Sequence, residues 1–119
     1  MKFTLLSKLF VLAMLPLAAA AQDSPSIRFG VDPSYAPLES KAQDGSLVGL
    51  DIDLGNAICA HLKAKCVWVE QTFDGMIPAL EARKFDAILS AMAATPARRK
   101  QIDFSHKLYA GPSSLVARS

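Results

Sequence analysis

The order of strand-like and helix-like patterns along the chain constrains the fold more than any other feature. Residues 26–31 alternate apolar and polar side chains, and the apolar runs at 67–69 and 85–89 favour strands. Helical spacing of apolar residues, or a helix start signal, follows each of these runs, at residues 51–62, 76–83 and 95 onward. A strand–helix order repeated in this way predicts an α/β fold with a parallel sheet.

The start of each helical segment carries its own signal. The first segment places four apolar residues on one face, namely Leu54, Ala57, Ile58 and Leu62. Asp51 and Asp53 lie at its beginning, where acidic side chains suit the helix dipole. Thr95 before Pro96 is an N-cap followed by a proline at the first helical position, which predicts a short third helix.

Turn-forming residues divide the remaining segments. Residues 32–37 contain two prolines and predict a loop, and Asp44-Gly45 is a hairpin-type turn signal. Residues 102–104 and 114–117 are short apolar runs, for which we expect two further strands.

The first 21 residues have the three-part pattern of a secretory signal peptide. Lys2 and Lys8 precede an apolar run, and Ala19 and Ala21 give a small-x-small cleavage site before Gln22. The alternative is a membrane anchor, but the apolar stretch from residue 9 to 21 is short for a span of about 20 residues. We therefore expect export, with residues 22–119 as the mature part.

The charge balance argues against a nucleic-acid partner. Without residues 1–21 the chain keeps 11 basic and 11 acidic residues, whereas nucleic-acid binders carry a basic excess. The 51% hydrophobic content permits a packed core and excludes disorder as the default.

The two cysteines, Cys59 and Cys66, both lie in the predicted mature part. An even pair in an exported chain favours a disulfide. Metal binding with His61 is the alternative, although this spacing matches no zinc pattern.

Three loops leave the carboxyl ends of the predicted strands, at residues 32–37, 71–74 and 90–99. Ligands of open α/β sheets bind at that edge, so we expect the loops to form one cleft. In the third loop, Arg98 beside a helix start can grip a carboxylate, and Ser90 adds a hydroxyl. The alternative is that Arg98 belongs to a solvated face.

The other two loops offer a site for a cation. Asp32 and Tyr35 lie in the first loop and Phe73 in the second, and a carboxylate beside aromatic faces can hold a cationic side chain. The alternative makes Asp32 a turn residue and the aromatics ordinary core. The sequence carries no recognisable catalytic motif, and His61 and His106 are isolated.

Several segments together resemble a known family over residues 27–117. They are GVDPSYAPLES, LVGLDIDLGNAIC, FDGMIPALEARKFDAILSAM, T-x-x-R and FSHKLYA. The chain resembles the periplasmic polar amino-acid-binding proteins of ABC importers, in particular the lysine/arginine/ornithine and histidine binders of solute-binding protein family 3. The resemblance implies a type II periplasmic-binding-protein-like fold of two lobes joined by a hinge. We expect residues 22–119 to be the N-terminal part of lobe one, with lobe two absent.

The resemblance assigns roles by position. Arg98 matches the arginine that pairs with the ligand α-carboxylate, and Tyr35 and Phe73 match the aromatic pair around the ligand side chain. Asp32 matches the acid that meets the distal cation, and Ser90 a serine near the ligand. Ala91 and Ala93 stand where close relatives carry serines, which removes two hydroxyls from the expected ligand-binding set. Cys59 and Cys66 match a disulfide of the basic amino-acid binders.

The resemblance implies a periplasmic, monomeric solute-binding protein that captures a polar, basic L-amino acid such as arginine, lysine, ornithine or histidine. It would deliver the ligand to an inner-membrane ABC permease, without catalysis, metal or other cofactor. Alternatives are a cyclohexadienyl (arogenate/prephenate) dehydratase-like enzyme on the same fold, a sensor ectodomain, or a fragment with no binding activity of its own.

Overall fold

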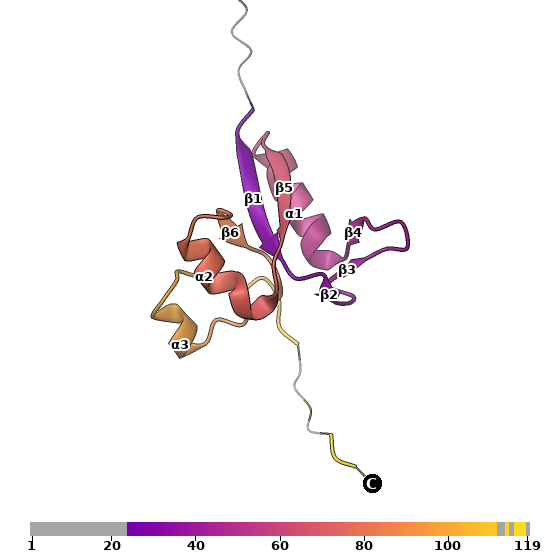
Figure 1. Ribbon diagram of the computed structural model, residues 1–119, viewed down its shortest axis with the longest axis vertical. Helices are drawn as coiled ribbons and strands as arrows, with labels where there is room; N and C mark the ends of the chain where they lie inside the picture. The colour runs from indigo at the N-terminus through magenta and orange to yellow at the C-terminus, as the bar shows by residue number, and fades with distance from the viewer. Residues whose placement is uncertain (1–23, 112–113, 115, 119) are drawn as a thin grey trace, which may run out of the picture.

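A three-stranded parallel sheet forms the centre of the computed structural model, which describes residues 24–111, 114 and 116–118 (Figure 1). Strand β1 (Ser26–Val31) lies in the middle, between β5 (Lys65–Glu70) and β6 (Ala87–Ile88). Both neighbours run parallel to β1. The predicted α/β class and its parallel sheet are confirmed.

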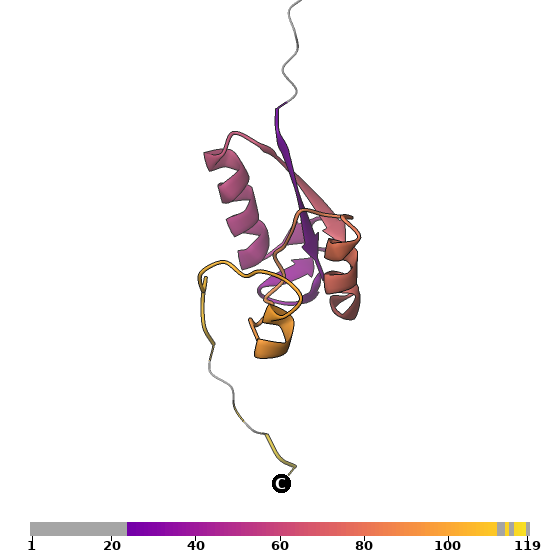
Figure 2. The ribbon, with the colours of Figure 1, turned by 90° about the vertical axis from the view of Figure 1, so that its left-hand side faces the viewer.

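Helices cover both faces of this sheet (Figure 2). Helix α1 (Leu50–His61) packs on one face, where Phe29, Cys59 and Leu89 are buried. Helix α2 (Met76–Glu81) lies on the other face and packs against the buried Phe85. A single turn, η1 (Phe73–Gly75), leads into α2, and a short helix α3 (Pro96–Arg99) follows β6. Among the residues that the structure describes, none of the helices is both long and apolar enough to cross a bilayer.

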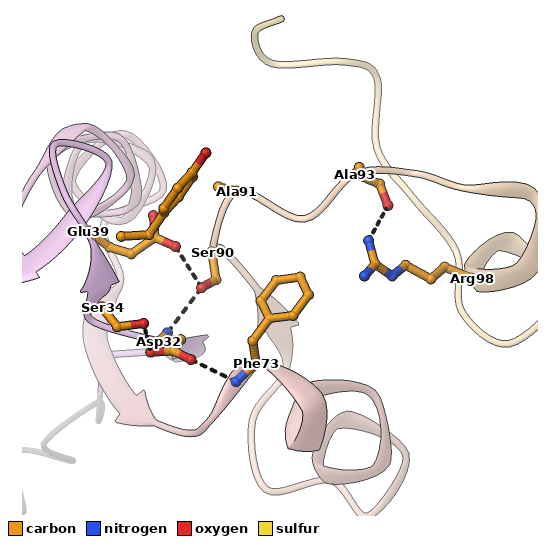
Figure 3. Close-up of a pocket in the computed structure, with 9 residues that line it drawn as sticks. Asp32, Ser34, Glu39, Phe73, Ser90, Ala91, Ala93 and Arg98 are labelled. Carbon is orange, nitrogen blue, oxygen red and sulfur yellow. Dashed lines mark hydrogen bonds between the residues drawn. The ribbon is translucent and has the colours of Figure 1, made fainter. Parts of the chain in front are cut away.

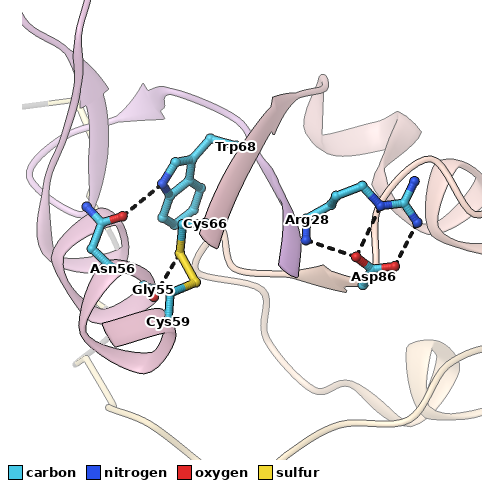
Figure 4. The surroundings of a disulfide bond; sticks show 7 residues. All are labelled: Arg28, Gly55, Asn56, Cys59, Cys66, Trp68 and Asp86. Atoms are coloured by element: carbon cyan, nitrogen blue, oxygen red, sulfur yellow. Dashed lines mark hydrogen bonds and ion pairs between the residues drawn. A yellow bond between two sulfur atoms is a disulfide. The ribbon is translucent and has the colours of Figure 1, made fainter. Parts of the chain in front are cut away.

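The predicted disulfide is confirmed and joins the end of α1 to β5 (Figure 4). Cys59 and Cys66 have their Cα atoms 5.7 Å apart. Nearby, the indole of Trp68 lies against the backbone of Gly55, where a Cβ atom would sit only 2.5 Å from the ring. The indole N–H of Trp68 donates to Asn56, so helix and strand are held together by covalent, steric and polar contacts.

A small antiparallel sheet extends from the end of β1. It consists of β2 (Ser34–Tyr35), β3 (Glu39–Lys41) and β4 (Leu47–Val48). The predicted turn at Asp44-Gly45 lies between β3 and β4, and Gly45 takes a positive φ of 82° there. The prediction of a loop throughout 32–37 is therefore wrong at β2, because the chain folds back after Pro37 and lets Ser34 pair with Ser40.

Several predicted boundaries also differ from the structure. The strand expected over 85–89 is reduced to β6, because the side chain of Phe85 turns into the core under α2. Leu62 ends α1 exposed rather than on its packed face. Residues 102–104 form no strand, because the amide of Ile102 turns back to the carbonyl of Arg98 and continues the turn after α3.

Two predictions fall wholly or partly outside the described residues. The signal peptide expected at residues 1–21 lies outside them, and so does residue 115 within the strand expected at 114–117. The described residues of that strand, 114, 116 and 117, are not in a strand.

Candidate ligand-binding site

A pocket of about 380 Å³ lies where the three parallel strands end (Figure 3). Residues from the segments after β1, β5 and β6 line it together, as predicted for the three loops at the carboxyl ends of the strands. Its lining residues are Asp32, Ser34, Tyr35, Glu39, Phe73, Ser90, Ala91, Ala93 and Arg98. All seven residues predicted from the sequence line this one pocket. Ser34 and Glu39 were not predicted.

The carboxylate of Asp32 connects two of the pocket loops. Its Oδ2 accepts a hydrogen bond of 2.7 Å from the backbone N–H of Phe73, and its Oδ1 accepts one of 2.6 Å from the hydroxyl of Ser34. A carboxylate offers about four acceptor positions, so Asp32 keeps acceptor capacity toward the pocket. Asp32 thus ties two pocket loops together and also presents a half-buried carboxylate on the pocket wall.

Ser90 lies behind Asp32, whose side of the pocket we call the acidic wall, and Ser90 is 2% exposed. Its hydroxyl donates to Glu39 Oε1 at 2.8 Å and accepts from the backbone N–H of Asp32 at 3.0 Å. One hydroxyl therefore fixes the ends of β1 and β6 to β3.

Glu39 is buried although it is ionisable, with 1% of its surface exposed. Burial raises the pKa of Glu39 to about 7. The hydrogen bond from Ser90 acts in the opposite direction, and smaller contributions from the neighbouring Asp51 raise the pKa further. The burial of Glu39 could not be predicted from the sequence, because β3 is too short to show which of its side chains face inward.

Asp51 lies in the first turn of α1 together with Asp53, as predicted, and it is also fully buried. Its Oδ2 accepts the backbone N–H of Ala91 at 2.8 Å, and its Oδ1 accepts the hydroxyl of Tyr109 at 2.9 Å. Burial, followed by the contact with Asp51, raises the pKa of Tyr109. Ala91 has a positive φ of 48°, so Asp51 holds the turn after Ser90 in an uncommon backbone conformation.

Arg98 lies on the opposite side of the pocket from Asp32, with Phe73 between them (Figure 3). The side chain of Thr95 caps α3 by accepting the N–H of Arg98, as predicted. The guanidinium donates from Nη1 to the carbonyl of Ala93 at 3.0 Å and lies 5.1 Å from the ring centre of Phe73. One of its five N–H groups is used in this bond, and the others have no acceptor within the described part of the chain, so they can meet an anion.

The neighbouring basic residues differ from Arg98. Arg99 and Lys100 are exposed, and the guanidinium of Arg99 lies over Phe104 instead. The solvated-face alternative therefore fits Arg99 and Lys100, whereas Arg98 is half-buried on the pocket wall. His61 and His106 are exposed and do not line the pocket.

The fold and the pocket define an α/β ligand-binding domain. A family model described as bacterial extracellular solute-binding proteins, family 3, matches residues 27–119. The chain belongs to this family.

Named relatives and solved structures agree with the family match. The chain is 47% identical to the L-arginine-binding protein of Pseudomonas aeruginosa over 97% of its length and 44% of the relative. It is 49% identical to the lysine/arginine/ornithine-binding periplasmic protein of Escherichia coli over 77% of its length and 35% of the relative. A Salmonella typhimurium periplasmic binding protein, solved to explain its high arginine specificity, is 41% identical with a TM-score of 0.69, over 70% of this chain and 37% of that one. The chain thus spans less than half of the relatives it matches.

Proposed function

We propose that this chain contributes the pocket of a solute-binding protein that captures a polar, basic L-amino acid. The observation that carries the proposal is the division of charge across one pocket, with Asp32 on one wall and Arg98 on the other. A basic amino acid has the matching arrangement, a carboxylate at one end and a cation at the other. The named relatives bind arginine, lysine or ornithine.

Arg98 is the proposed partner of the ligand α-carboxylate. A guanidinium donates two parallel hydrogen bonds to a carboxylate, which gives both energy and orientation. The existing bond to Ala93 and the ring of Phe73 hold the side chain in place before the ligand arrives. A preorganised arginine loses less conformational freedom on binding.

Asp32, Tyr35 and Phe73 are the proposed partners of the ligand side chain. Tyr35 is 59% exposed and Phe73 is half-buried, so both rings offer surface to an aliphatic stem or a flat guanidinium. Asp32 supplies the negative charge for the distal cation. Ser90 lies beneath Asp32 and fixes its backbone.

Ala91 and Ala93 are the proposed source of a difference in affinity from close relatives. Both line the pocket and contribute no hydroxyl to it. A hydrogen bond to a charged ligand group contributes about 1.5–3 kcal/mol, so serine at either position should strengthen binding.

We also propose that the protein binds without catalysis. The named relatives are described as binding proteins, which supports this proposal over the dehydratase alternative. The proposed setting is the periplasm, with a monomeric protein that delivers its ligand to an inner-membrane ABC permease.

Isothermal titration with L-arginine tests the carboxylate assignment. Arg98→Ala should weaken binding by 100-fold or more, since two charge-assisted hydrogen bonds contribute about 3 kcal/mol or more. Arg99→Ala is the matched control, because Arg99 is the next residue of the same helix and lies over Phe104. Equal affinities of the two variants would contradict the assignment.

A further inference from the structure

Two carboxyl groups lie buried side by side beneath the acidic wall of the pocket. Glu39 comes from β3 and Asp51 from the first turn of α1, and neither is more than 1% exposed. Two adjacent buried negative charges repel strongly, so one of the two groups is expected to hold a proton.

The hydrogen bonds indicate which group holds it. Asp51 accepts bonds on both oxygens, from the N–H of Ala91 and the hydroxyl of Tyr109, so its acceptor positions are largely used. Glu39 accepts one bond, from Ser90 to Oε1. Its Oε2 is buried and finds no donor among the described residues, which suits a carboxyl O–H directed to Asp51.

The charges around Glu39 are mostly negative or neutral. Asp32 faces it from the end of β1, Asp51 from α1, and Tyr109 and Tyr35 are the nearby phenols. Among the residues that line the pocket, Arg98 is the cation, and it is directed to Ala93 and Phe73. A cation brought to the acidic wall by a ligand would therefore change the charge balance at Glu39.

We propose that the proton held by Glu39 leaves when a basic ligand binds, so that capture exchanges one proton for one cationic side chain. This inference rests on the proposed function. Glu39 lines the same pocket as Asp32, and the hydroxyl of Ser90 bridges the Glu39 carboxylate, at 2.8 Å, and the backbone N–H of Asp32, at 3.0 Å. The Asp32 carboxylate is close enough to Glu39 for its charge to raise the pKa of Glu39. An opposite charge within about 4–6 Å favours the ionised form of a carboxyl group by 1–3 pKa units. Glu39 thereby selects for a cationic ligand without needing to touch it.

The exchange has a definite pH dependence. The pKa of Glu39 is about 7 before the ligand binds, and the cation lowers it. With a lowering of about 1–3 pKa units, binding near pH 6 should release about 0.4–0.9 proton, and binding near pH 8 about 0.1 or less. The affinity for arginine should accordingly rise about 5–10-fold between pH 6 and pH 8, a range in which an ordinary glutamate with a pKa of about 4.3 does not titrate.

Isothermal titration in buffers of different ionisation enthalpy measures the released protons directly. L-arginine should release about 0.4–0.9 proton at pH 6, whereas L-citrulline, its neutral analogue of almost the same shape, should release none. The Glu39→Gln variant should bind arginine with an affinity that is flat between pH 6 and pH 8. The comparison of the two ligands uses the unaltered protein, so it does not depend on folding of the variant.

Arginine binding with no proton released at pH 6, or equal release with citrulline, would overturn the exchange and leave the proposed function intact. Absence of arginine binding at every pH would overturn the proposed function, and the exchange with it.

Discussion

Removal of the disulfide is the perturbation whose effect on stability follows most directly from the structure. Cys59 and Cys66 are seven residues apart, so the bond closes a loop of eight residues. In the chain-entropy model, opening a loop of this length lowers the free energy of unfolding by about 2.5 kcal/mol. This corresponds to a roughly 70-fold larger fraction of unfolded chain.

The single tryptophan of the chain reports this transition. Trp68 packs on Gly55 one helical turn before Cys59, so its fluorescence changes when α1 leaves β5. Urea unfolding should be followed with and without a reducing agent, in the unaltered protein and in the Cys59→Ala/Cys66→Ala double variant. Reductant should lower the urea midpoint of the former and leave the latter unchanged. An unaltered protein whose urea midpoint is the same with and without reductant would refute the stabilising role of the disulfide.

Two further predictions concern the packing and charge of the same sheet. Gly55→Ala should lower the free energy of unfolding by about 1–3 kcal/mol, because the added Cβ would overlap the Trp68 ring. Gly111→Ala is the control in the same urea assay and should have little effect, since a Cβ there would meet nothing within 4 Å. Hydrogen bonds from Arg28 lower the pKa of Asp86 to about 2 (Figure 4). The pairing of Arg28 with Asp86 therefore stabilises the fold fully above the ordinary pKa of 3.8, and this stabilisation is lost as the pH falls toward 2. The stability difference between the unaltered protein and Arg28→Gln should therefore shrink between pH 4 and pH 2, and a constant difference would exclude this linkage.

The order of elements and the place of the pocket were accessible from the sequence for a physical reason. The alternation at 26–31 is long enough to indicate a strand, and parallel strands bring their carboxyl-end loops together. Asp32, Phe73, Ser90 and Arg98 could thus be assigned to one site from the loops that carry them. The capping pair Thr95-Pro96 fixed the start of α3 because its chemistry is local.

Features that depend on contacts between residues far apart in the sequence could not be predicted from it. Asp51 is buried and bonds to Tyr109, which is 58 residues away, and nothing near Asp51 in the sequence indicates this. Glu39 lies on a strand of three residues, too short for an alternating pattern, and its environment is set by α1 and the segment after β6. Both buried acids beneath the pocket therefore appear only when the chain is folded.

The most direct test of the account is a titration of the ¹⁵N-labelled protein with L-arginine and with agmatine, the same molecule without its carboxylate. L-arginine should shift the amide signals of Phe73, Ala93 and Arg98, which line both sides of the proposed site. Agmatine should bind more weakly and leave the signals around Arg98 largely unmoved. Equal shifts with the two compounds, or L-arginine shifts confined to residues outside the pocket, would contradict the claim that this pocket holds a basic amino acid by both of its charged ends.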